Sequence, residues 1–313
     1  MRITTANNYA NSIASMQAQQ QALDSAQQQI STGLRVAVPG DDPIAAARAE
    51  RALATMVGNE ADQRALQASQ NMTTQVESAL GSATDLLQQA RSLVTQAGDG
   101  SLGPSDYGSI ATQLQSIRGQ LLAVANSTDG AGSYLFGGQG SKSPPLVDGS
   151  GGVSYQGTPG QATIQGSQAM PMGMDGNQVW LQAPNPGGGA PLSPFGVLDG
   201  MISSLQAAAT STSTAAKPVV AAAVTTGLSG LDAVAANISA ARSSAGGALN
   251  SLNSVSTQLQ QSTLSAQTTQ SNAIDMDMVK GISTVQKLQT NYQAALQSYA
   301  SIQKISLFNY ISA

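Results

Sequence analysis

The chain has 313 residues, enough for two or three domains, but only 4% of them are aromatic. Because aromatic side chains supply much of the core energy of compact domains, their scarcity favours an elongated body held together by helix seams. The formal net charge of -4 favours neither a nucleic-acid nor a membrane partner. Cys and His are absent, which excludes disulfides, thiol nucleophiles, thiolate and imidazole metal ligands and the usual neutral-pH base. We therefore expect no catalytic residues, no cofactor and no metal.

The first residues carry one cation but no apolar stretch behind it, so we expect no cleavable secretory signal. We also expect no membrane span, because no segment reaches the roughly eighteen apolar residues that a span requires.

The first predicted helix carries an apolar seam interrupted by glutamines. Tyr9, Met16, Leu23 and Ile30 follow one another at intervals of seven residues. A neighbouring line contains Ile13 and Leu34, with Gln20 and Gln27 between them. A seam with these polar gaps should be marginal as an isolated pair.

A break in the pattern ends this helix. Pro39 and the following Gly40 stop it, and Asp41 and Asp42 precede Pro43. Asp is a preferred N-cap residue, and proline fits the first position of a helix without losing a hydrogen bond. We predict that Asp42 caps a second helix that begins at Pro43. The alternative, a catalytic or metal-binding carboxylate pair, is less favoured.

The next segments predict long rod helices. The second helix runs towards Ala97, with Leu66, Leu80, Leu87 and Val94 on one line. A Gly-rich break at 98–103 precedes a third helix over about 110–124. After the middle of the chain, leucines and isoleucines from 228 to 259 form another seam, preceded by an Ala/Thr/Ser connection at 207–216.

Residues 137–194 differ in character, since Gly and Pro are frequent there and punctuate any helix. Short β-forming runs at 153–155, 161–165 and 178–182 predict strands of a small, loop-rich β domain. The order of the segments predicts a hairpin. The helices of the first half lead away from the N-terminus to this domain at the far tip, and the helices of the second half return and bring the two termini together. The fold class is thus mainly α, a long antiparallel helical hairpin rod with a terminal coiled coil and a small inserted β domain.

The last predicted helix carries a second apolar stripe, followed by an aliphatic cluster at 305–311. One antiparallel pair cannot cover both stripes and this cluster, so the remainder needs a partner. We expect residues 1–40 and 273–313 to become ordered on assembly. The predicted assembly interface is Tyr9, Ile13, Met16, Leu23, Ile30, Leu34, Met278, Ile282, Val285, Leu288, Tyr292, Leu296, Tyr299, Ile302, Ile305, Leu307, Phe308 and Ile311.

Five segments of the sequence together resemble a known protein family. Residues 1–3, 27–36, 39–47, 132–138 and 305–311 resemble the flagellin family of bacterial flagellar proteins, and within it the branch at the hook–filament junction. The helix patterns, the break at 39–43 and the Gly- and Pro-rich middle predict a terminal coiled-coil assembly domain at 1–42 and 273–313, a helical rod at 43–136 and 195–272, and a small β domain at 137–194.

The resemblance also implies partners and a location. It implies an extracellular subunit, exported unfolded by a type III apparatus, that forms a homo-oligomeric ring or collar. Its expected neighbours are a hook-side junction protein and flagellin, with an export chaperone on the C-terminal helix beforehand. Two alternatives stay open: a minor flagellin, and a type III secreted coiled-coil effector or translocator.

Overall fold

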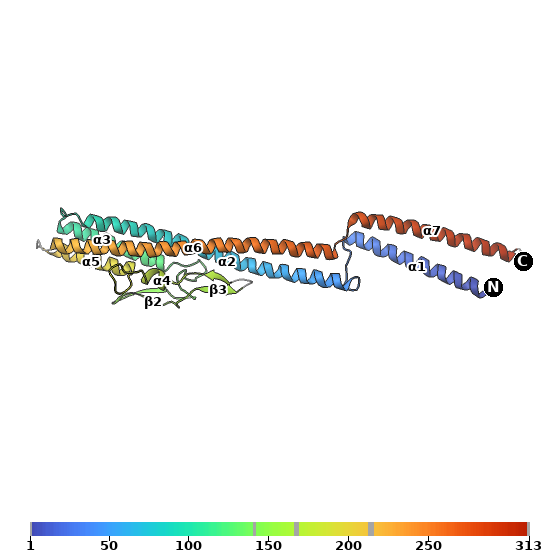
Figure 1. The fold of residues 1–313 in the computed structure, drawn as a ribbon, viewed down its shortest axis with the longest axis horizontal. Coiled ribbons are helices and arrows are strands. Elements are labelled where there is room, and N and C mark those ends of the chain that lie inside the picture. The colour runs from blue at the N-terminus through green and yellow to red at the C-terminus, as the bar shows by residue number, and fades with distance from the viewer. Residues whose placement is uncertain (1, 140–141, 166–168, 212–215, 312–313) are drawn as a thin grey trace. The chain divides into compact units, whose positions relative to one another are not determined.

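In the computed structural model of the protein, residues 2–139, 142–165, 169–211 and 216–311 are described. The chain forms two compact units. One contains Met1–Asn59 and Gln260–Ala313, and the other is Glu60–Leu259. The prediction of a mainly α fold is confirmed (Figure 1). The bounds of the helices are α1 (Arg2–Thr32), α2 (Pro43–Ala97), α3 (Pro104–Ala125), α4 (Gly176–Leu181), α5 (Pro194–Thr210), α6 (Ala216–Ile274) and α7 (Met278–Ile311).

The long helices α2 and α6 pair antiparallel in the Glu60–Leu259 unit. The Gln70 side chain donates to Asn253 over 3.1 Å, and Arg242 donates to Glu77 over 2.5 Å. As the residue number rises on α2, the number of its partner on α6 falls. The predicted seam is confirmed, because Leu66, Leu80, Leu87 and Val94 of α2 are buried, as are Leu231, Ile238, Leu252 and Leu259 of α6.

Two shorter helices complete this bundle. After the turn at 98–103, α3 doubles back along α2, and α5 packs against α3. The Ser193 hydroxyl caps α5 by accepting from the Gly196 amide over 2.9 Å, and Pro194 takes the first helical position. At Gly227 of α6 a Cβ atom would lie 2.6 Å from the sulfur of Met201, so a larger residue there would require the Met201 side chain of α5 to shift.

The strands form two separate antiparallel hairpins. β1 (Leu146–Gly149) pairs with β2 (Gly152–Tyr155), and β3 (Ala162–Gln165) pairs with β4 (Ala169–Met172). The predicted strands at 153–155 and 161–165 are therefore confirmed. The Asn126 side chain links α3 to β1, because it both donates to the Leu146 carbonyl and accepts from the Leu146 amide.

The predicted strand at 178–182 is wrong, because these residues belong to α4. Asp175 begins the helix by accepting from the Asn177 amide over 2.9 Å. Val179 and Trp180 are both buried, so burial does not alternate as it would along a strand. Trp180 contacts Phe136 edge-on at 5.3 Å and lies 6.2 Å from the ring of Phe195.

The prediction that the β region lies at the far tip of the helices is also wrong. Met170 of β4 is buried against Leu66 of α2 and Leu252 of α6, and Ser69 of α2 donates to the Pro171 carbonyl. The strands thus lie along the side of the bundle. The reason is length: α3 has 22 residues and α2 has 55, so the chain leaves the bundle well before it has retraced α2.

The expectation that no segment is apolar enough to span a membrane needs correction. The Lys217–Ile274 part of α6 contains an 18-residue window with mean hydropathy 1.6, which by length and composition is apolar enough to cross a membrane. Core helices of folded proteins can reach such values, and α6 buries Val220, Leu231, Val234 and Ile238 in this bundle.

An arginine links three elements of the same unit. Arg118 of α3 donates twice to Asp148 of β1, at 2.6 and 2.9 Å, and binds Asp199 of α5 at 2.6 Å. Its side chain is 14% exposed. The hydrogen bonds from Arg118 hold the pKa of Asp148 below its ordinary value of 3.8.

Substitution of Arg118 by Met should lower the free energy of unfolding by about 1–3 kcal/mol at pH 7, because two carboxylates lose charged donors. A depressed carboxyl pKa contributes stability that is complete above the unfolded pKa and is lost as pH falls through the folded pKa. The parent should therefore lose stability below about pH 4, and the variant should lose less. Urea unfolding at pH 7 and pH 3 measures both effects.

Arg91→Met is the matched control. Arg91 pairs with Asp232 at 3.1 Å, but both side chains are more than half exposed, so its loss should cost less than about 1 kcal/mol. Equal losses for the two variants would contradict the role given to Arg118.

Candidate assembly surface

The helices α1 and α7 form an antiparallel pair in the unit that contains both ends of the chain (Figure 1). Tyr9 and Tyr299 meet edge-on with ring centroids 6.1 Å apart. The Tyr292 hydroxyl lies 3.4 Å from the side-chain oxygen of Gln20, so one of the predicted polar gaps is filled by a hydrogen bond. Gly281 allows close contact, since a Cβ there would lie 3.3 Å from Ile30.

The pair leaves its apolar stripes incompletely covered. Among the residues of α1 and α7 whose burial the structure describes, Ala26 and Gly281 alone are buried. Of the predicted interface, the members that are half-buried are Tyr9, Met16, Leu23, Ile30, Leu34, Val285, Leu288, Tyr292 and Tyr299. The members that are exposed by 41–47% are Ile13, Met278, Ile282 and Leu296.

The remaining predicted members lie near the C-terminus. The side chains of Ile302, Ile305, Leu307, Phe308 and Ile311 lie outside those that the structure describes. Leu34 lies beyond the end of α1 at Thr32, and its backbone forms a bridge with Asp275.

The break between α1 and α2 is a defined connection. The Asp42 carboxylate accepts from the Ala45 amide over 3.0 Å, which caps α2 at Pro43 as predicted and lowers the pKa of Asp42. Asp41 has a different task, since it accepts from the amides of Ala37 and Val38. Pro39 lies exposed between these two turns. Both carboxylates are thus engaged by backbone groups, which supports the structural reading over a catalytic pair.

A second connection joins α6 to α7 beside the first. The Met276 amide donates to the Gly33 carbonyl over 2.9 Å, and the Arg35 amide donates to the Ile274 carbonyl over 2.7 Å. Asp277 caps α7 by accepting from the amides of Val279 and Lys280, which lowers its pKa. Asp275 and Asp277 therefore both lie in the connection between the end of α6 at Ile274 and the start of α7 at Met278.

Several exposed apolar residues near these connections were missed by the sequence analysis. Val279 is 77% exposed, Ile44 67% and Val38 56%. A search for heptads overlooks them, because Val38 is in a loop and Ile44 and Val279 lie in first turns of helices. Their position directly beside the prolines and the capping aspartates was the available signal.

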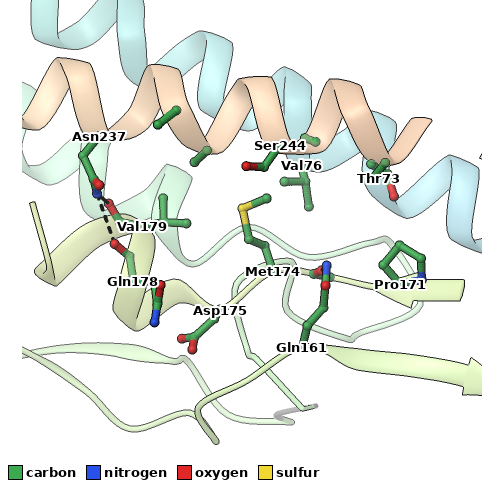
Figure 2. A pocket seen from close by; sticks show the side chains of 15 residues that line it. Thr73, Val76, Gln161, Pro171, Met174, Asp175, Gln178, Val179, Asn237 and Ser244 are labelled. Atoms are coloured by element: carbon green, nitrogen blue, oxygen red, sulfur yellow. Dashed lines mark hydrogen bonds between the residues drawn. The ribbon is translucent and has the colours of Figure 1, made fainter. Parts of the chain in front are cut away.

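A cavity of about 400 Å³ lies in the Glu60–Leu259 unit. Figure 2 shows Met174 and Val179 on one side of it and Val76 on the other. Asp175 is the one charged residue in the lining, and it accepts from the amides of Asn177 and Gly160. Asn237 donates to the carbonyls of Gln178 and Val179. Asn237 thus links α6 to α4, and Asp175 holds the loop at Gly160 to the start of α4.

Comparisons with known proteins agree with this arrangement. Residues 3–141 match the family model of the bacterial flagellin N-terminal helical region. The flagellar hook-associated protein 3 of Salmonella typhimurium is 30% identical, over 98% of this chain and 99% of the relative. The chain belongs to the flagellar hook-associated protein 3 family.

Solved structures of hook-associated proteins share the fold. The flagellar hook-associated protein-3 from Legionella pneumophila has a TM-score of 0.63 at 19% identity, covering 70% of this chain and 97% of that one. The flagellar junction protein from the same organism has a TM-score of 0.56 at 20% identity, covering 62% and 95%. Among the described residues of this family member, no cluster of three acidic groups could hold a metal ion.

Proposed function

We propose that this chain is a structural subunit of the bacterial flagellum that forms the junction between hook and filament and assembles through α1 and α7. The observation that carries the proposal is the incomplete cover of the apolar stripes on these two helices. Ile13, Ile282 and Leu296 remain 41–47% exposed. Covering the rest of such a side chain contributes roughly 1 kcal/mol, so a few of them per contact supply a sizeable driving force.

The proposed partners follow from the family. They are further copies of the chain in a ring or collar, a junction protein on the hook side, and flagellin on the filament side. An export chaperone would cover the C-terminal helix before assembly, and the subunit would act outside the cell without having carried a cleavable signal. We propose no catalysis and no nucleic-acid or membrane partner. The three-domain division at 1–42 with 273–313, 43–136 with 195–272, and 137–194 is part of the same proposal.

Covering the seam by assembly also explains its composition. Helices in proteins owe most of their stability to the packing of an apolar face, so a pair depends on the apolar surface it buries. A seam with Gln20 and half-buried tyrosines holds together loosely in one molecule, yet its polar groups keep the monomer soluble. The same surface would serve first within the subunit and then between subunits.

A strain that lacks this gene tests the function. We expect hook–basal bodies without filaments and monomeric flagellin in the medium, and complementation with the parent gene should restore attached filaments. Electron microscopy and immunoblots of the medium provide the measurements. Attached filaments of normal length in the deletion strain would refute the junction role. If the chain were the bulk protein of sheared filaments, the minor-flagellin alternative would hold.

A further inference from the structure

A groove with a volume of about 370 Å³ lies between α2 and α6 in the unit that contains both ends of the chain. Its floor is small and apolar, because Ala52 and Ala266 are buried there. Longer polar side chains stand on both sides of this floor. The walls are formed by Arg48, Arg51 and Thr55 from α2 and by Ser262, Ser265 and Thr269 from α6.

The opposite side of α2 carries a ridge. Leu53 is 41% exposed and Val57 58% exposed, and Glu50 lies one turn before Leu53. Each ridge residue follows a groove residue by two positions, and two positions rotate a side chain by about 200° around a helix. The groove side and the ridge side of α2 therefore face in opposite directions.

The groove and the ridge are complementary in charge as well as in shape. Neither Arg48 nor Glu50 has an ion-pair partner within the described part of the chain, and Arg51 makes only a 3.2 Å hydrogen bond to its own helix at Ala47. Two guanidinium groups are thus available on one side of α2, and a carboxylate on the other. Apolar Leu53 and Val57 match the alanine floor.

We propose that the ridge Glu50, Leu53 and Val57 of one copy of this chain inserts into the α2–α6 groove of the next copy. This inference rests on the proposed function, and it adds a contact outside α1 and α7. Opposite complementary faces give a head-to-tail contact, which closes into a ring when the rotation allows it. In a ring, the contacting groups of neighbouring copies lie at the same position along the axis of α2. Glu50 lies between Arg48 and Arg51 along this axis, and Leu53 lies between Ala52 and Thr55.

Single and paired cysteines test this contact, because the natural chain contains none. Leu53→Cys places a thiol on the ridge, and Thr55→Cys places one at the groove. The full-length variants are produced in the gene-deletion strain, and isolated flagella are treated with a short bismaleimide. Immunoblots then show the size of the cross-linked products. We expect the double variant to give a ladder of dimers, trimers and larger species, and each single variant to remain monomeric.

The control pair is Gly58→Cys with Thr55→Cys. Gly58 is exposed with open space beside it and lies about 100° from Val57 and about 140° from Leu53 around α2, so this pair should give no ladder above background. A dimer from Leu53→Cys alone would show a symmetric contact and overturn the proposal. So would a double variant that is present in isolated flagella but no more cross-linked than the control pair. Absence of the parent chain from isolated flagella would instead refute the proposed function.

Charge reversal provides an independent readout. Arg48→Glu with Arg51→Glu, added to the cysteine pair, should reduce the ladder by at least about tenfold, and further addition of Glu50→Arg should restore much of it. A ladder unchanged by the reversal would contradict the assigned charge contact.

Discussion

Cells that carry Val285→Asp and Leu288→Asp should have hooks but at least about tenfold fewer attached filaments than the parent. Both residues are half-buried on α7, where a copy or a neighbouring protein would complete their cover. A carboxylate at these positions would have to be buried without a partner, which costs several kcal/mol and disfavours assembly. Electron microscopy of flagella and the amount of flagellin in the medium measure the effect.

The matched control places the same two charges on the exposed side of the helix. Gln286→Asp and Gln293→Asp change exposed residues, and this variant should retain attached filaments. Trp180 is the only tryptophan of the chain, and it lies in the Glu60–Leu259 unit. Its fluorescence should be unchanged in both variants, which separates an assembly defect from unfolding of that unit. Equal loss of filaments in both variants would refute the assignment of Val285 and Leu288 to the interface.

Trp180→Ala should lower the free energy of unfolding by about 3–5 kcal/mol. The indole is completely buried and contacts Phe136 and Phe195, so its removal leaves a large cavity and breaks two aromatic contacts. The segment after α3 would lose its anchor on α4 and α5. Urea unfolding followed by circular dichroism measures the loss, because fluorescence is not available in this variant.

Trp180→Phe provides the comparison. It retains an aromatic ring and removes a buried indole nitrogen that has no hydrogen-bond partner in the described structure. We expect less than half the loss caused by alanine. Equal losses for Phe and Ala would show that the site depends on the indole itself and not on filling the space between Phe136 and Phe195.

The long helices and their ends could be predicted because each depends on local rules. Pro43 and Asp42 marked the start of α2, and the glycines after Ala97 marked its end. The seam residues Leu80, Leu87 and Val94 were correctly identified because a core between two helices repeats at a fixed interval. The predicted α1–α7 stripe followed from the same rule.

The errors arose where long-range packing decided the outcome. Val179 and Leu181 alternate with polar or aromatic neighbours as in a strand, but Asp175 capped a helix and Trp180 was needed in the core beside Phe136. The position of the β hairpins followed from the length of α3 relative to α2, which no local pattern encodes. The groove at Arg48 and Arg51 needs two helices to exist, so a reading of one helix at a time could not reveal it.

The α1–α7 pair and the two connections that lead into it join residues that are far apart in the sequence. Arg35 donates to the Ala273 carbonyl across 238 positions, and Tyr292 reaches Gln20 across 272. The Glu60–Leu259 unit, by contrast, is a single continuous stretch of the chain. Contacts between residues far apart in the sequence form slowly. The middle of a newly made polypeptide can therefore fold before α1 and α7 pair. The α1–α7 assembly surface then forms last, which shortens the time during which it can associate with other copies before export or assembly.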